Sequence, residues 1–363
     1  MTLRVLITAD AVGGVWSYAL DLARGLANHG VETILALTGP APSADQRAVA
    51  ASIPSLTPIE TGLPLDWLVE TPAEVAQAGA AIARLASATR VDLVHLNTPA
   101  LAASAGAFDV PLVIAAHSCV ASWWEAAATG LLPDAFRWRT ELHAAGLRAA
   151  THAIAPTAAF AATAHRLYGV RPSVVHNGRD PFTHRPAPMH DAAITVGRLW
   201  DKGKDVRTLD AAAARLSVPL FAAGSLQGPN GDSIEPEHLH PLGHLSDEQL
   251  GERLAARPVF VSSALYEPFG LAVLEAAAAG CALVLSDIPT FRELWDGCAT
   301  FVDPHDAPGF AHAIDALIGD QNRRVSQGEA ARARARRYTP AATAAQTYAI
   351  YRGLLPATEA VAA

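Results

Sequence analysis

The chain has 363 residues, of which 51% are hydrophobic, so it can bury a large core and is long enough for two domains. Its formal net charge of −8 excludes a general affinity for polyanions such as nucleic acids. No apolar run reaches the roughly 18 residues of a membrane span, and no basic-then-apolar leader opens the chain, so we expect a soluble cytoplasmic protein.

The three cysteines are scattered and form no C-x-x-C pair. Their odd number and spacing argue against a disulfide framework or a zinc site. We expect Cys119, Cys281 and Cys298 to be buried small apolar side chains.

The first elements predict a parallel sheet. A strand is expected over residues 3–9, a glycine turn at Gly13 and Gly14, a helix over about 15–29 and a second strand over 31–37. Strand, glycine turn, helix and strand are typical of the opening of a doubly wound α/β fold. The turn lacks the G-x-G-x-x-G pattern, so it does not indicate a nicotinamide dinucleotide.

Two later strands end in histidines. A helix over about 72–88 leads to a strand ending at His95, and a strand over 111–116 ends at His117. Strand ends of an open parallel sheet face the ligand crevice, so both histidines are candidates, although a lone histidine there is more often structural. Five of the seven tryptophans lie in the first 150 residues, where indoles suit an acceptor sugar or, more simply, core packing: Trp16, Trp67, Trp123, Trp124 and Trp138.

The second half restarts the strand and helix pattern. Residues 179–193, rich in Pro, His and polar side chains, are the best candidate linker, and strands and helices alternate again from residue 194. Lys202 and Lys204 are the only lysines among 27 basic residues. Their retention suggests a need for a compact ammonium group at this loop.

Residues 258–289 are the stretch around which the chain is organised. A strand over 259–262, a loop ending at Gly270, a helix over 271–279 stopped by Gly280 and a strand over 282–286 are predicted. Pro268 suits a first helical turn, and a helix N-terminus attracts anions. Glu267 and Glu275 are eight residues apart, just over two helical turns, so both acids are expected on one side. The stretch predicts a site for a phosphate whose attached groups carry hydroxyls.

The run E-P-F-G-L-x-x-x-E, with Ser263 before it and Gly280 and Glu293 after it, resembles the E-x7-E donor motif of retaining glycosyltransferases of family 4, which have the GT-B fold. The plainer alternative is a βαβ unit with a surface acid. The resemblance covers nearly the whole chain and is strongest over residues 194–304.

The resemblance implies an α/β fold of two Rossmann-like domains that face each other across a cleft. Residues 1–180 would form the acceptor-side domain, and residues 190–338 the domain that binds the nucleotide-sugar donor. A C-terminal helix over about 339–356 would cross back to the N-terminal domain.

The resemblance also implies roles for individual residues. Arg198, a nearby lysine and the helix start would neutralise the donor diphosphate, Glu275 would accept from the ribose, and Glu267 would orient the sugar. Lys204 is preferred to Lys202 because it directly precedes a helix. The implied catalytic residues are His117, Glu267, Arg198 and Lys204, and the implied donor-binding residues are Gly13, Gly14, Gly224, His244, Leu245, Phe269, Gly270, Leu271 and Glu275.

The implied reaction moves a glycosyl group from a nucleotide sugar to a saccharide or small-molecule acceptor with retained configuration. No D-x-D pattern is present, so no metal and no other cofactor is expected. Peripheral membrane contact stays open. Two alternatives remain at this point: a nucleotide-sugar 2-epimerase of the same fold, or a non-catalytic module that binds nucleotide sugars.

Overall fold

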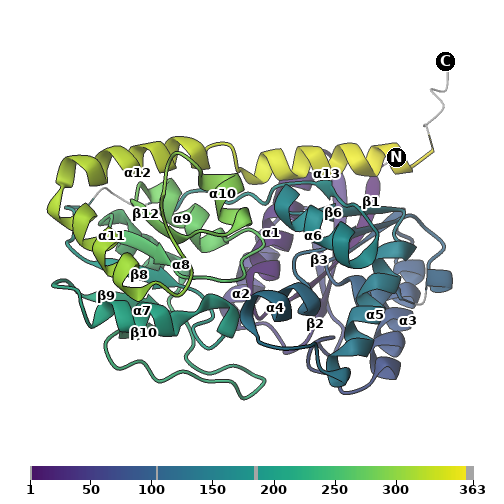
Figure 1. Ribbon diagram of the computed structural model, residues 1–363. Helices are drawn as coiled ribbons and strands as arrows, with labels where there is room; N and C mark the ends of the chain where they lie inside the picture. Colours follow the sequence, from purple (N-terminus) through teal and green to yellow (C-terminus); the bar gives the residue numbers. More distant parts are fainter. Residues whose placement is uncertain (1, 104, 184–186, 357–363) are drawn as a thin grey trace. The chain divides into compact units, whose positions relative to one another are not determined.

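The computed structural model describes residues 2–103, 105–183 and 187–356, which group into two compact units (Figure 1). The first unit contains the described residues up to 121, residues 131–178 and the described residues from 340 onward. The second contains residues 122–130 and the described part of 179–339. The short segment 122–130 therefore belongs to a different unit from its neighbours in sequence.

The first unit is built on a parallel sheet with the strand order β3-β2-β1-β4-β5-β6-β7. The order reverses between β1 and β4, which places the switch point of a doubly wound sheet there. The strands are β1 (Leu3–Asp10), β2 (Val31–Thr38), β3 (Leu56–Glu60), β4 (Leu93–Leu96), β5 (Leu112–Ala115), β6 (His152–Ala155) and β7 (Ser173–Val174).

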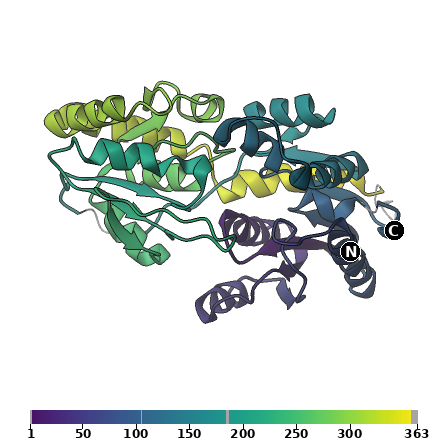
Figure 2. The ribbon, with the colours of Figure 1, turned by 60° about the horizontal axis from the view of Figure 1, so that its bottom comes forward.

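Helices cover this sheet, and the last helix of the chain is one of them. They are α1 (Gly14–Ala27), α2 (Ala44–Ala51), α3 (Pro72–Ala88), α5 (Asp134–Ala149), α6 (Ala158–Tyr168) and α13 (Pro340–Leu354). α13 lies beside the elements of the first unit in both ribbon views (Figures 1 and 2). It approaches α1 so closely that a Cβ on Gly25 would lie 2.5 Å from that of Ala344. The tail helix is thus a packed part of the first unit, as expected.

The second unit has a parallel sheet of the order β10-β9-β8-β11-β12-β13, which again reverses once, between β8 and β11. The strands are β8 (Ala193–Val196), β9 (Leu220–Ala223), β10 (His240–Gly243), β11 (Val259–Ser262), β12 (Leu283–Ser286) and β13 (Thr300–Val302). The helices around it are α7 (Val206–Ala213), α8 (Asp247–Ala255), α9 (Leu271–Ala279), α10 (Pro289–Trp295), α11 (Ala307–Gly319) and α12 (Gln321–Ala335).

Both faces of the second sheet are buried. Along β11, Val259 and Val261 pack into the cluster that contains residues of α7 and α11, whereas Phe260 points to the cluster of α8, α9 and α10. A parallel sheet covered on both faces explains why its strands are nearly continuous apolar runs. Ligands must therefore approach this unit at the ends of the strands.

The predicted elements appear within a few residues of their expected bounds, and α3 and α9 agree at both ends. The prediction that the three cysteines are buried is also confirmed for Cys119, Cys281 and Cys298. In the part of the chain that the structure describes, no helix is both long and apolar enough to cross a membrane.

Candidate active site

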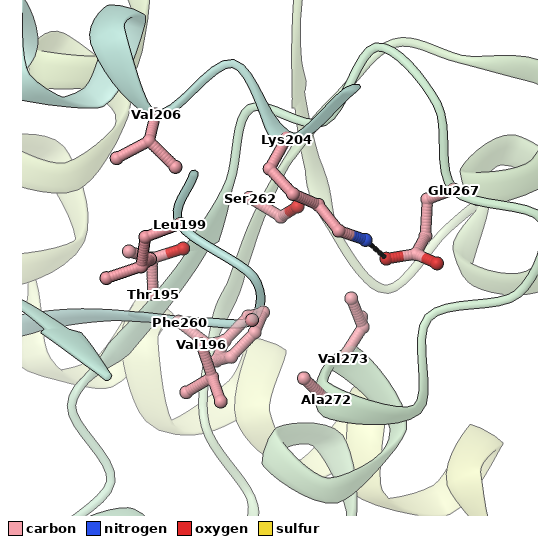
Figure 3. A pocket seen from close by; sticks show the side chains of 11 residues that line it. Thr195, Val196, Leu199, Lys204, Val206, Phe260, Ser262, Glu267, Ala272 and Val273 are labelled. Atoms are coloured by element: carbon pink, nitrogen blue, oxygen red, sulfur yellow. Dashed lines mark hydrogen bonds and ion pairs between the residues drawn. The ribbon is translucent and has the colours of Figure 1, made fainter. Parts of the chain in front are cut away.

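A pocket lies at the switch point of the second sheet, where the loops after β8 and β11 meet the start of α9 (Figure 3). This is where doubly wound folds bind ligands, because the neighbouring loops leave in opposite directions. The lining residues are Thr195, Val196, Gly197, Leu199, Lys204, Val206, Phe260, Ser262, Glu267, Ala272 and Val273.

Lys204 and Glu267 point toward each other in this pocket and form an ion pair between Nζ and Oε2 (Figure 3). Their side chains are 18% and 20% exposed. Lys204 ends the short 3-10 turn η3 (Lys202–Lys204), while Lys202 in the same turn is exposed. The pocket thus presents one ammonium and one carboxylate, which suit the phosphates and hydroxyls of a single ligand.

Arg198 precedes Lys204 by six residues in the chain and is held by a buried acid. Its Nη2 lies 2.8 Å from Oδ2 of Asp201, which is 7% exposed, while the Arg198 side chain is 52% exposed. Burial alone would raise the pKa of Asp201, but the charges of Arg198 and Lys204 and two hydrogen bonds hold that pKa below its usual value. Asp201 is therefore an ionised anchor for the guanidinium.

Two glycines allow the loops around the pocket to touch. Gly197 and Gly224 have φ values of 155° and 136°, and a Cβ on Gly224 would lie only 1.8 Å from the carbonyl oxygen of Gly197. The N–H of Gly224 donates to the carbonyl of Gly243 over 2.7 Å. The exposed His244 and the half-buried Leu245 follow that contact, after β10.

Pro268 does not lie where the sequence predicts. Gly270 is the N-cap with φ 90°, and α9 begins at Leu271, so Pro268 lies before the helix and not in its first turn. Phe269 is 3% exposed and packs edge-on against Tyr338 at 5.9 Å. Its side chain therefore belongs to the core, and only its backbone is available to a ligand.

Helical spacing does not relate Glu267 to Glu275, because Glu267 lies in the loop before α9. The left-handed backbone at Gly270 separates the loop from the helix, so Glu267 projects from the loop and Glu275 from the second turn of α9. Glu275 pairs with Arg179, whose Nε lies 2.9 Å from its Oε1. Arg179 also contacts Asp247 at the start of α8, with 2.7 Å between Nη2 and Oδ2.

Arg179 is a partner of Glu275 that the sequence did not indicate. It follows the Asn177-Gly178 pair by one residue and precedes Glu275 by 96, so no periodicity connects the two. Its side chain is 14% exposed and that of Glu275 is 11% exposed, which makes this ion pair nearly buried. Only the fold brings them together.

In the first unit, the structure places His117 just beyond β5. Its Nε2 lies 2.9 Å from Oδ1 of Asn97, whose Nδ2 donates to the carbonyl of Thr8 over 2.6 Å. Burial lowers the pKa of His117 to about 4, so its imidazole is neutral at pH 7. The N-cap of α1 is Gly13, and Gly14 is the first residue of that helix.

His95 has a structural position. It is fully buried, its Nδ1 lies 2.6 Å from the hydroxyl oxygen of Tyr351 on α13, and desolvation lowers its pKa to about 3. His95, the third residue of β4, therefore ties the last helix to the first sheet.

Among the residues that the structure describes, no group of three His, Cys, Asp or Glu side chains is arranged to hold a metal ion. The two aspartates that flank the lysines in sequence have other partners: Asp201 binds Arg198, and the Asp205 carboxylate lies 2.9 Å from Nδ1 of His305. The Lys204–Glu267 ion pair and the start of α9 face the pocket.

Two family models match the chain. Residues 12–181 match Glycosyltransferase Family 4, and residues 233–334 match Glycosyl transferases group 1. The alpha-maltose-1-phosphate synthase of Mycobacterium tuberculosis is 29% identical over 316 residues, which are 75% of this chain and 81% of that protein. The glycogen synthase of the same species is 31% identical over 277 residues, 68% of this chain and 64% of that enzyme.

Solved structures show the same architecture. A sucrose-phosphate synthase from Thermosynechococcus elongatus superposes with a TM-score of 0.78 at 19% identity and covers 97% of this chain and 99% of its own. The Anabaena protein HepE, solved with UDP and glucose, gives a TM-score of 0.74 at 18% identity over 97% of this chain and 100% of its own. The fold and the family matches together identify this chain as a glycosyltransferase of group 1, family 4, with two Rossmann-like domains in the GT-B fold.

Proposed function

We propose that this protein transfers a glycosyl group from a nucleotide-sugar donor to a saccharide or small-molecule acceptor, with retained anomeric configuration and without a metal ion. The observation that carries the proposal is the Lys204–Glu267 ion pair in the pocket at the switch point of the second sheet. An ammonium, a carboxylate and a helix start in one pocket match the diphosphate and the hydroxyls of such a donor.

The donor would exchange partners with this pair. Its phosphates would draw the Lys204 ammonium away from Glu267 and accept hydrogen bonds from the backbone N–H groups in the first turn of α9. The freed Glu267 carboxylate would accept hydrogen bonds from the sugar, and Glu275, held by Arg179, would accept from the ribose hydroxyls. In the absence of a donor, Lys204 and Glu267 would thus satisfy each other's charges, and the donor phosphates and sugar hydroxyls would replace these contacts.

The chemical difficulty is the negative charge that grows on the departing diphosphate. The bond between the anomeric carbon and the phosphate oxygen breaks, and the electron pair leaves with the nucleoside diphosphate. The acceptor oxygen attacks from the same face, and its proton passes to the leaving phosphate oxygen. Lys204, Arg198 and the α9 N-terminus are fixed positive groups that stabilise this charge.

His117 would contact the transferred sugar as a neutral imidazole, fixed by Asn97. Gly13 and Gly14 would let donor phosphates or acceptor approach the backbone at the start of α1, and the loops at Gly224 and at His244 and Leu245 would hold the nucleobase. The first unit would receive the acceptor.

The relatives support this class of donor and product. They include synthases of a maltose phosphate and of glycogen, and a phosphatidyl-myo-inositol mannosyltransferase from Mycolicibacterium smegmatis that is 29% identical over 195 residues. HepE was solved with UDP and glucose, which are the parts of a donor of this kind.

The proposal is tested by incubating the protein with UDP-, GDP-, ADP- and dTDP-sugars and an acceptor panel, and by following release of the nucleoside diphosphate. Proton NMR of the fresh product gives its anomeric configuration. We expect release from at least one donor, retention in the product, and loss of release in Glu267→Ala. Interconversion of the donor sugar without transfer would instead show a 2-epimerase. Binding without any turnover would show a non-catalytic module.

A further inference from the structure

The segment 122–130 contacts the loops of the pocket, although its neighbours in sequence on both sides belong to the first unit. It contains most of helix α4 (Val120–Ala127), which begins three residues after His117. Two consecutive side chains make the contacts. The indole Nε1 of Trp123 donates to Oδ1 of Asp201 over 2.9 Å, and the hydroxyl of Ser122 donates to that of Tyr266 over 2.9 Å.

Asp201, which accepts the hydrogen bond from Trp123, also contacts Arg198 and the backbone of Lys204. Its Oδ2 holds Arg198, and its Oδ1, the oxygen bound by Trp123, also accepts the N–H of Gly203 over 2.9 Å. Its backbone carbonyl accepts the N–H of Lys204 over 2.8 Å. The orientation of one buried carboxylate therefore determines where the guanidinium and the turn that carries the ammonium lie.

Gly203 connects the same turn to the loop of Glu267. Its carbonyl accepts the N–H groups of Leu265 and Tyr266 over 2.9 and 3.1 Å. A Cβ on Gly203 would lie 2.9 Å from Nε1 of Trp123, closer than side chains pack, so the indole rests directly on this residue. Trp123 thus covers the junction of the two loops that supply Lys204 and Glu267.

We propose that Trp123 is a positioning residue of the donor site, whose indole N–H orients Asp201 and through it Arg198 and the Lys204 turn toward the leaving diphosphate. The proposal rests on the proposed function and assigns Trp123 a task other than stacking on an acceptor or filling a core. Trp123 touches neither substrate nor reacting atoms in this scheme.

The test compares Trp123→Phe with Trp124→Phe. Phenylalanine keeps an aromatic ring but removes the N–H donor, and Trp124 is a matched control because its Nε1 donates to the carbonyl of Gly130 over 3.1 Å and not to Asp201. Loss of a hydrogen bond to a charged group corresponds to a decrease in rate of about tenfold or more. We expect Trp123→Phe to lower kcat about tenfold, to change the donor KM much less, and to leave the melting temperature within a few degrees of the wild type.

A double mutant tests whether the effect of Trp123 on kcat acts through Asp201. If Trp123 acts through Asp201, the combination of Trp123→Phe with Asp201→Asn should be no slower than Asp201→Asn alone. Gly203→Ala, which pushes the indole away, should lower kcat in the same manner as Trp123→Phe. Multiplicative losses in the double mutant, or a normal kcat in Trp123→Phe, would overturn the proposal.

Fluorine NMR of 5-fluorotryptophan-labelled protein supplies a readout that does not depend on turnover. The Trp123 resonance is the one that is absent from Trp123→Phe, and it should shift when UDP, GDP, ADP or dTDP is added singly. A resonance that is unmoved by a diphosphate that binds would contradict the assignment while leaving the proposed function intact. If no diphosphate binds and no donor is turned over by the wild type, the proposed function fails and this assignment fails with it.

Discussion

The guanidinium of Arg179 holds the carboxylate of Glu275, with 2.9 Å between Nε and Oε1, and both side chains are nearly buried. The same guanidinium reaches the Asp247 carboxylate, which is 77% exposed, with 2.7 Å between Nη2 and Oδ2. One arginine therefore has a buried and an exposed acidic partner. The buried partner, Glu275, is the acid to which we assign the binding of the donor ribose.

Replacing Arg179 should damage nucleotide binding and stability together. Removing one partner of a buried ion pair leaves an uncompensated charge and costs about 3–5 kcal/mol. We expect Arg179→Ala to lower the free energy of unfolding by up to that amount and to weaken nucleoside diphosphate affinity about tenfold, because Glu275 loses its orientation. Urea unfolding and titration calorimetry measure the two quantities.

Asp247→Asn is the matched control, because it removes only the exposed partner of the same guanidinium. Exposed ion pairs contribute about 0–1 kcal/mol, so stability and nucleotide affinity should both stay close to the wild type. An equal effect of Arg179→Ala and Asp247→Asn on affinity would show that the contact with Glu275 is not the important one.

Chelation should not abolish the transferase activity. We assign neutralisation of the diphosphate to Arg198, Lys204 and the α9 N-terminus, so turnover in EDTA should equal turnover in untreated buffer. Complete loss in EDTA with recovery on adding magnesium or manganese would contradict the assignment of this task to the cationic side chains.

Acid should destabilise the first unit through its buried histidines. The pKa values of His95 and His117 are lowered from 6.5 to about 3 and about 4 by burial. Between pH 6.5 and those values the unfolded chain binds protons that the native chain does not, so the free energy of unfolding falls as pH falls. Each histidine contributes a slope of up to about 1.4 kcal/mol per pH unit.

Asp66 acts with the opposite sign, because burial raises its pKa from 3.8 to about 6. As the pH falls from 6 to 4, Asp66 binds a proton in the native protein before it does so in the unfolded chain. This raises the free energy of unfolding and offsets the contribution of one histidine. Denaturant unfolding at several pH values measures the net slope. His117→Gln, which keeps a hydrogen-bonding side chain beside Asn97, should make that slope shallower, and an unchanged slope would show that His117 does not titrate in this way.

Sequence periodicity predicts the elements well because both sheets are doubly wound and their strands are short apolar runs bounded by glycine or proline. The E-x7-E stretch indicates the pocket because strand, loop and helix start are consecutive in the chain. The position of Pro268 was predicted wrongly because a proline is acceptable both inside a first turn and just before one. Only the left-handed conformation at Gly270 decides between them.

The partners of the charged residues could not be predicted in this way. Arg179 and Glu275 are 96 residues apart, Trp123 and Asp201 are 78 apart, and neither pair belongs to a local motif. Such pairs depend on which loops the sheet order brings to one edge. Sequence reasoning therefore indicated Lys204 and Glu267, which line the pocket, but not the partners Arg179 of Glu275 and Trp123 of Asp201.

The most direct test of the site is the kinetic comparison of Lys204→Ala with Lys202→Ala. Lys204 faces the pocket and pairs with Glu267, while Lys202 in the same turn is exposed. If the Lys204 ammonium stabilises charge on the leaving diphosphate, its loss should lower kcat roughly a hundredfold to a thousandfold and change donor affinity much less. Lys204→Arg should recover only part of the rate, because a planar guanidinium does not replace a compact ammonium.

The decisive number is kcat of Lys204→Ala at saturating donor, measured beside the donor dissociation constant and beside Lys202→Ala. The account predicts a loss of at least about a hundredfold in kcat for Lys204→Ala and a nearly normal rate for Lys202→Ala. A near-normal kcat in Lys204→Ala, or a severe loss in Lys202→Ala instead, would contradict it.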